Sequence, residues 1–138
     1  MKYLLDTSII SELISQKPNP SVVEFVDSLD QEDMYLSVIT IGEITRAIQK
    51  IYEPRRKSLV ETWVQDQLFP RFDGHILSLD AKIMKLWGEV YARLEGMDIN
   101  MPAVDSMLVA TALAHRLVLV TINDDDFSGA GIEVVNPW

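Results

Sequence analysis

The sequence predicts an α/β fold with a mainly parallel central sheet, and three observations support this prediction. Short apolar runs of strand length alternate with longer segments in which apolar residues recur every three or four positions. Such alternation is typical of βα units, whose helices connect parallel strands. The chain has 138 residues, of which 48% are apolar, and it has no cysteine. This composition supports a core without disulfides, so we expect a single domain over residues 1–138.

Five short apolar runs are the expected strands. The first is Tyr3-Leu4-Leu5, which ends at an acidic residue. The others cover residues 34–38, 75–77, 117–120 and 132–135. The run at 117–120, Leu-Val-Leu-Val, has the length and apolar character of a buried parallel strand.

Three helices are expected in the first part of the chain. Thr7 or Ser8 is expected to cap the first, which would run to about residue 15. A second is expected over residues 21–29, after the break at Lys17-Pro18-Asn19-Pro20. A third is expected over residues 40–51, where isoleucines recur at helical spacing.

Three more helices are expected beyond residue 53. Pro54 fits the first turn of a helix that would carry Leu59, Trp63 and Val64 toward the core. Asp80 is a plausible cap for the next helix, and Pro102 opens a final one that reaches about residue 115. The helix after Asp80 has an apolar stripe of Ile83, Trp87, Val90 and Leu94.

The charge of the chain bears on its partners. The formal net charge is −9, which ordinarily counts against binding to nucleic acid. Bound divalent cations would weaken that objection, because they become the largest local charges. Five of the 12 basic residues fall within residues 46–57, and Arg46 and Lys50 are our candidate RNA contacts there. The same stretch is equally compatible with a solvated helix end and loop.

The apolar runs also bear on location. None approaches the roughly 20 residues that a membrane-spanning helix needs. We therefore expect no membrane association. The first acid, Asp6, comes too early for a signal peptide and the chain has no cysteine, so a cytoplasmic location is expected.

Acidic residues follow two of the expected strands. Asp6 ends the first strand, and the run Asp124-Asp125-Asp126 comes just after the strand at 117–120. Ligand sites in open parallel sheets collect outside the carboxyl ends of the strands. These carboxylates are therefore expected at the same edge of the sheet.

Two further acids lie at the starts of expected helices. Asp105 is in the first turn after Pro102, and the residues three, four and seven positions later are Leu108, Val109 and Ala112. It therefore shares the apolar face of its helix, which a simple N-terminal acid would not explain. Glu43 lies in the opening turn of the helix expected over residues 40–51, at the edge of its isoleucine stripe.

If these acids meet, they need a cation. Two carboxylates about 4 Å apart repel by roughly 4 kcal/mol at an effective dielectric constant of 20. Oxygen ligands select a hard ion, so Mg²⁺ or Mn²⁺ is expected. Zinc is not expected, because the chain lacks cysteine and His75 and His115 show no ligand spacing. Such a site suits phosphodiester hydrolysis by a metal-activated water, without a nucleophile from the protein.

Four segments in order along the chain resemble PIN-domain ribonucleases, and more closely the VapC/FitB-type toxins of prokaryotic toxin–antitoxin modules. The segments are "LLDTSIISEL", "TIGEI", "PAVDSMLVATAL" and "LVTINDDDF…GIEVVNPW". The resemblance implies a three-layer α/β/α fold and endonucleolytic cleavage of RNA that depends on Mg²⁺ or Mn²⁺. It also implies a homodimer that a cognate VapB/FitA-like antitoxin inhibits, with the antitoxin's tail in the active-site groove.

The resemblance also implies roles for residues. Asp6, Glu43 and Asp105 match the first three acids of the family's site, with Asp6 and Asp105 as the main metal ligands. For the fourth place we expect Asp124, with Asp126 next in order and Asp125 facing solvent. The residues expected to support these catalytic and metal-binding acids are Thr7, Ser8, Thr121, Asn123 and Asp126. An arginine that relatives often have at the position of Ile122 is missing, which removes a possible substrate contact.

Two other functions are compatible with the fold. One is a metal-dependent phosphatase or a phosphorylated signalling domain, but these usually have a lysine after a later strand. None follows the strand at 117–120. The other is a non-catalytic PIN-like module that only binds RNA or a partner, and the intact acids argue against it.

Overall fold

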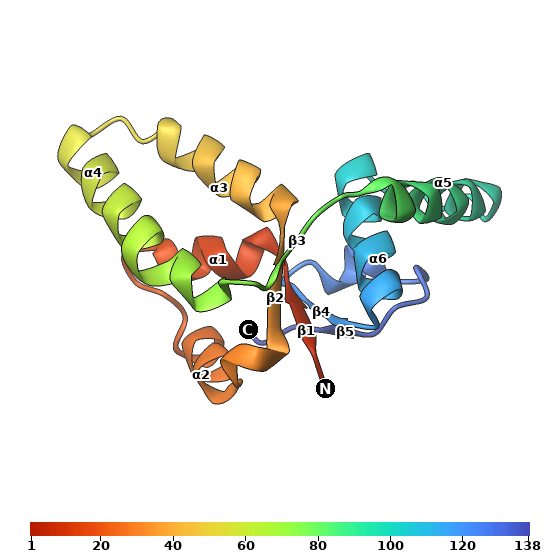
Figure 1. The fold of residues 1–138 in the computed structure, drawn as a ribbon, viewed down its shortest axis with the longest axis horizontal. Coiled ribbons are helices and arrows are strands. Elements are labelled where there is room, and N and C mark those ends of the chain that lie inside the picture. The colour runs from red at the N-terminus through yellow and green to blue at the C-terminus, as the bar shows by residue number, and fades with distance from the viewer.

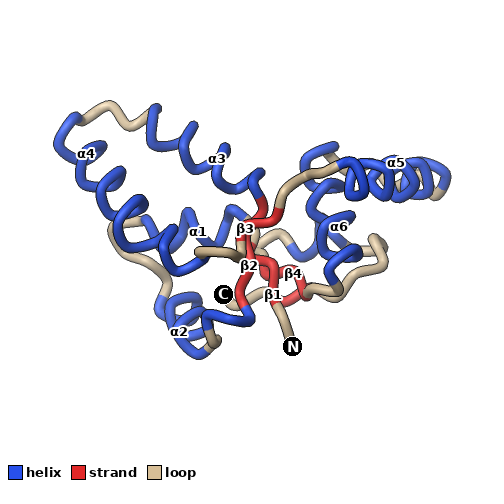
Figure 2. The backbone as a smooth tube through the Cα atoms, in the orientation of Figure 1, coloured by secondary structure: helices blue, strands red, loops and turns tan.

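The structure is a computed structural model that describes residues 1–138. It has a five-stranded sheet between two layers of helices, so the predicted three-layer α/β/α fold is confirmed (Figures 1 and 2). The strand order is β3-β2-β1-β4-β5, and every neighbouring pair is parallel. The strands are β1 (Tyr3–Leu5), β2 (Met34–Ser37), β3 (Ile76–Leu77), β4 (Val118–Val120) and β5 (Val134–Val135).

Six α-helices cover the sheet. The first four lie on one side of it and the last two on the other (Figure 1). In chain order they are α1 (Thr7–Ile14), α2 (Pro20–Ser28), α3 (Val38–Gln49), α4 (Pro54–Trp63), α5 (Ala81–Gly96) and α6 (Ala103–His115). None of them is long and apolar enough to span a bilayer.

Each face of the sheet has its own hydrophobic core. Consecutive strand residues point to opposite faces, and Leu4 and Leu5 show this directly. Leu5 packs with the residues of α1 to α4, whereas Leu4 packs with those of α5 and α6. In β4, Val120 likewise packs in the core beside α1 to α4, and Leu119 packs in the core beside α5 and α6. The central strands are therefore buried on both faces, which explains why their sequences are continuously apolar.

The order of the strands determines where a site can form. The chain passes from β1 to β2 and β3 on one side, and then crosses to place β4 on the other side of β1. The backbone N–H of Asp6 donates to the carbonyl oxygen of Val120 at 2.9 Å, so the carboxyl ends of β1 and β4 lie side by side. Open α/β sheets bind ligands at such a reversal of strand order.

The expected starts of two helices are wrong by a few residues. Asp6, and not Thr7 or Ser8, caps α1, because its Oδ1 accepts the N–H of Thr7 at 2.8 Å. Helix α3 begins at Val38 with Ser37 as its cap, so Glu43 lies in its second turn and not in its opening turn. In both cases the cap is the residue that ends the preceding strand or directly follows it.

The core-facing side of α4 is also different from the expected one. Val60 and Val64 are 4% exposed, as predicted for Val64, but Leu59 is 61% and Trp63 37% exposed. Residues four apart share a face, and Val60 and Val64 are the pair that packs into the core beside α1 and α3. Leu59 and Trp63 lie on the adjoining face. The expected stripe of α5 is correct for Ile83, Val90 and Leu94, and Asp80 is its cap.

Candidate active site

Asp6 stands where β1 ends and α1 begins. It is 8% exposed, and no other acidic side chain is buried. Its Oδ1 accepts the N–H of Thr7, while its Oδ2 accepts hydroxyl hydrogen bonds from Thr121 at 2.7 Å and from Ser8 at 3.0 Å. These neutral donors stabilise a buried carboxylate. They also hold it in one orientation at the edge of the sheet.

Thr121 and Ser8 also organise the loop after β4. The N–H of Asn123 donates to Thr121 Oγ1 at 3.0 Å, and the N–H of Ile122 donates to Ser8 Oγ at 3.3 Å. The two hydroxyls therefore connect the Asp6 carboxylate with the backbone of residues 121–123. Three of the residues predicted to support the site, Ser8, Thr121 and Asn123, belong to this network.

Glu43 reaches the same edge from α3. Thr7 Oγ1 donates to Glu43 Oε1 at 2.6 Å and lies 2.9 Å from Thr40 Oγ1. A threonine hydroxyl has one proton. Because Thr7 gives its proton to Glu43, Thr40 must be the donor to Thr7. The buried Thr40 therefore orients Thr7, which in turn holds the exposed Glu43 carboxylate.

Asp105 lies in the first turn of α6 and is half-buried. Burial, together with the negative charges of Asp6, Asp126 and Glu43, raises the pKa of Asp105 above its usual range. Carboxylates affect one another in this way only when they are close. Four acids that are distant in the sequence are thus brought together here: Asp6, Glu43, Asp105 and Asp126.

The loop after β4 contributes Asp126 to this group more directly than Asp124. Residues Asp124–Phe127 form a short 3₁₀ turn, in which Asp126 N–H donates to the Asn123 carbonyl oxygen. Asp126 is among the charges that act on Asp105. Asp124 instead accepts a hydrogen bond from Asn136 Nδ2 at 3.0 Å. The charge effect of Asp126 on Asp105, and the hydrogen bond that engages Asp124 with Asn136, favour Asp126, our second choice from the sequence, over Asp124 for the fourth place.

Asn136 is a site residue that the sequence analysis missed. Its Nδ2 donates to the Ile122 carbonyl oxygen at 3.3 Å as well as to Asp124. Its Oδ1 accepts the N–H of Trp138, whose side chain packs on the core beside α1 to α4. The C-terminal segment thus holds the acidic loop against the sheet. An asparagine after a terminal strand has no distinctive spacing in the sequence, and the same is true of Thr40.

The donors at this site suit a hard divalent cation. All four acids offer oxygen atoms, which Mg²⁺ and Mn²⁺ prefer. Burial raises the pKa of Asp105, and the negative charges of Asp6, Asp126 and Glu43 raise it further. As the side chains stand, no three of them are close enough to enclose a metal ion. The site therefore fits a divalent cation in the chemistry of its donor atoms and in its charge, and not yet in the spacing of its side chains.

The histidines lie elsewhere. His75 Nδ1 is 2.9 Å from the Met34 carbonyl oxygen, and its ring stacks on Tyr35 at 4.4 Å between centroids. His115 is exposed at the end of α6. Each has a structural or surface position.

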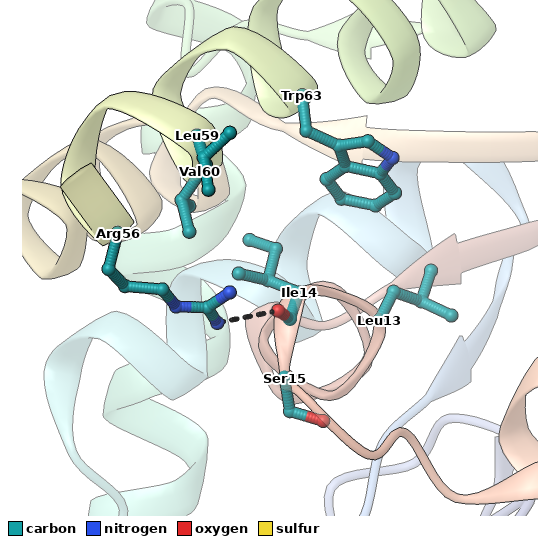
Figure 3. Close-up of a pocket in the computed structure, with 7 residues that line it drawn as sticks. All are labelled: Leu13, Ile14, Ser15, Arg56, Leu59, Val60 and Trp63. Atoms are coloured by element: carbon teal, nitrogen blue, oxygen red, sulfur yellow. Dashed lines mark hydrogen bonds between the residues drawn. The ribbon is translucent and has the colours of Figure 1, made fainter.

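A hollow of the surface lies apart from the acids. It has a volume of about 410 Å³ and lies between α1 and α4 (Figure 3). Arg56 crosses it and donates from Nη2 to the Ile14 carbonyl oxygen at 3.1 Å. Its lining residues are Leu13, Ile14, Ser15, Arg56, Leu59, Val60 and Trp63. With no carboxylate and a mainly apolar lining, this hollow suits an apolar partner and not a metal-dependent reaction.

Comparisons with known proteins identify the family to which this fold belongs. Residues 3–133 match the PIN domain family. Toxin FitB of Neisseria gonorrhoeae is 34% identical over 98% of this chain and 97% of its own length. VapC ribonuclease Y4jK of Sinorhizobium fredii is 27% identical over 98% and 96%.

Solved structures show the same likeness. The crystal structure of FitAcB from Neisseria gonorrhoeae superposes with a TM-score of 0.94 at 32% identity, over 99% of this chain and 98% of that one. DNA-bound VapBC from Salmonella typhimurium gives a TM-score of 0.82 at 26% identity, over 100% and 99%. The similarity therefore covers the whole sheet and every segment that carries an acid.

Proposed function

The chain belongs to the PIN-domain family, and from this premise we propose that it is an endoribonuclease toxin of a toxin–antitoxin module, dependent on Mg²⁺ or Mn²⁺. The observation that carries the proposal is that Thr7 connects the Asp6 and Glu43 carboxylates by hydrogen bonds, beside the half-buried Asp105. Burial, and then the charges of Asp6, Asp126 and Glu43, raise the pKa of Asp105. The names of the relatives support the choice of reaction, since one is a VapC ribonuclease and another a tRNA(fMet)-specific endonuclease VapC.

The four acids would hold the cation, with Asp6 and Asp105 as its main ligands. A divalent cation at such a site activates a water for attack on phosphorus and stabilises the charge that develops on the phosphate. Ser8, Thr121 and the N–H of Thr7 keep the Asp6 oxygens in place. Thr7 keeps Glu43 pointing toward the same space, where it helps to hold the cation or to position the water. In this reaction the nucleophile is a water that the cation activates, and the protein residues only hold the cation and position that water. The chain therefore needs no nucleophile of its own.

A cognate antitoxin is the proposed inhibitor, and a homodimer is the proposed assembly. The similar solved structures include FitAB and VapBC complexes, which supports a protein partner of this kind. The apolar hollow between α1 and α4 fits such a partner, because Leu59 and Trp63 are exposed beside it, one helical turn apart (Figure 3). An amphipathic helix can place its apolar side in a groove of this type.

The function is tested by incubating the purified protein with a pool of transcripts, with and without Mn²⁺, and mapping the new ends. We expect cleavage that yields 5′-phosphate ends, stops when a chelator is added, and is lost in Asp6→Asn and Asp105→Asn. Cleavage by Asp105→Asn at the parent rate would overturn the assignment, and ends with cyclic phosphates would indicate different chemistry.

Two controls separate the alternatives. Release of phosphate from small phosphomonoesters, or a stable aspartyl-phosphate, would indicate a phosphatase or a phosphorylated signalling domain. RNA or partner binding without any Mn²⁺ binding in calorimetry would indicate a non-catalytic module.

A further inference from the structure

One flank of α3 leads away from the acids toward the loop between α3 and α4. Glu43, Arg46 and Lys50 follow one another at intervals of three and four residues. At about 100° per residue they fall within roughly 60° of one another around the helix. All three are exposed. Because Glu43 is held at the acidic site by Thr7, Arg46 and Lys50 extend outward from that site on the same flank.

These two cations have no acidic partner. The chain has 21 acidic residues, but its single ion pair joins Arg71 and Asp27 on another surface. Two neighbouring cations make contacts within the protein: Arg56 with the Ile14 carbonyl oxygen and Lys57 with Gln49 Oε1. Arg46 and Lys50 make none. Their charges are therefore available to an anion from outside.

Tyr52 follows in the loop between α3 and α4 and is 99% exposed. Its ring contributes to neither hydrophobic core. Aromatic rings beside cations are what single-stranded nucleic acid needs, because bases stack on the rings and phosphates pair with the cations. A protein partner would instead be expected to cover a contiguous apolar patch, whereas the exposed residues of this flank, Arg46 and Lys50, are charged.

We propose that single-stranded RNA next to the cleaved bond lies along this flank, with phosphates at Arg46 and Lys50 and a base stacked on Tyr52. This proposal rests on the proposed ribonuclease function, and we call these three residues the α3 track. Glu43 and Lys50 are about 10 Å apart along the helix axis. At roughly 3.4 Å per nucleotide of a stacked strand, that distance accommodates about three nucleotides. The α3 track would also offset the repulsion between RNA and a chain of net charge −9.

The test measures binding separately from cleavage. A fluorescently labelled, single-stranded RNA oligonucleotide is titrated with the protein in an Asp105→Asn background and followed by anisotropy. We expect Tyr52→Ala to weaken binding about tenfold, and Tyr52→Phe to retain it because the ring is kept. Arg46→Ala and Lys50→Ala should each reduce the slope of log K against log salt by about 0.7.

Lys17→Ala is the matched control, because it removes one exposed positive charge far from the site. Lys17 follows the end of α1, whose eight residues lead about 12 Å away from Asp6. This variant should bind RNA with the affinity and salt dependence of its background. Thermal unfolding of each variant shows whether the fold is intact, which the exposure of Tyr52 leads us to expect.

The outcomes distinguish the α3 track from the ribonuclease assignment. If the unmodified protein cleaves RNA but the track variants bind it as Lys17→Ala does, the track is wrong and the ribonuclease proposal stands. If the unmodified protein does not cleave RNA but binding still depends on Tyr52, the track stands and the ribonuclease proposal fails. A change in self-association without a change in RNA binding would show that this flank is a protein interface, and would overturn the proposal.

Discussion

Thr121 Oγ1 donates a hydrogen bond to Asp6 Oδ2 at 2.7 Å, across 115 positions of the sequence. The two residues follow β4 and β1, which pair in parallel at the centre of the sheet. Asp6 is buried and Thr121 is fully so. This hydrogen bond therefore connects the ends of β1 and β4, where the strand order reverses. It also fixes the Asp6 carboxylate, which is a main metal ligand in the proposed reaction.

Thr121→Val should remove this bond with little change in shape. A hydrogen bond to a buried charged group contributes about 1.5–3 kcal/mol, so we expect a loss of that order in the free energy of unfolding, measured with urea. Thr121→Ser, which keeps the hydroxyl, should recover most of it. Thr62→Val on the exposed side of α4 is the control and should stay within about 0.5 kcal/mol. Equal losses in the two valine variants would contradict the role given to the bond.

The raised pKa of Asp105 predicts how the stability of the metal-free protein depends on pH. Its pKa is raised in the folded state by burial and by Asp6, Asp126 and Glu43, so the folded protein holds this proton more tightly than the unfolded chain does. Stability is then highest below the usual carboxyl range and falls as pH rises through that range to the raised value. In chelator, Asp105→Asn should remove this decline and raise the melting temperature at neutral pH.

The control for Asp105 is Asp66→Asn, an exposed acid in the turn after α4. It should keep the pH dependence of the parent. A melting temperature for Asp105→Asn below that of the parent at neutral pH, in chelator, would contradict the crowding of charge at this site.

Asp126 and Asp124 should differ in their effect on activity. Asp126 acts on Asp105, whereas Asp124 is bound to Asn136. Residues that support or complete a metal site typically contribute about 10–100-fold. We expect Asp126→Asn to lower RNA cleavage by that factor and Asp124→Asn to lower it less. The reverse order would restore the expectation that we drew from the sequence.

Asn136 should act as a positioning residue. Asn136→Ala removes the hydrogen bonds to Asp124 and to the Ile122 carbonyl oxygen, and so releases the loop that carries Asp126. We expect kcat to fall about tenfold and the Mn²⁺ concentration for half-maximal activity to rise, as for other supporting residues. Asn100→Ala, in the exposed loop before α6, should leave both quantities unchanged. An unchanged Mn²⁺ requirement in Asn136→Ala would mean that this residue has only a structural role.

The comparison of α4 with α5 shows where pattern reasoning succeeds. On α5, Ile83, Val90 and Leu94 form a stripe that is apolar on one side only, and the structure buries them. On α4 and the helical turn that directly continues it, Leu59, Val60, Trp63 and Val64 offer two apolar faces, and the sequence does not say which one meets the core. Packing beside α1 and α3 selects Val60 and Val64.

The sequence by itself determined the alternation of strands and helices, and it placed Asp6 at the end of β1 and Asp105 at the start of α6. It placed Glu43 on α3 but one turn too close to the start of that helix. The spacing of apolar residues and the positions of helix caps and prolines are local properties, so they can be recognised from the sequence alone. Only the tertiary structure decided which acid of the 124–126 run approaches Asp105, and that Thr40 and Asn136 hold the site. Those choices depend on hydrogen bonds between segments such as β1, α3 and the C-terminal residues, whose distances are set by the packing of the sheet and have no counterpart in sequence spacing.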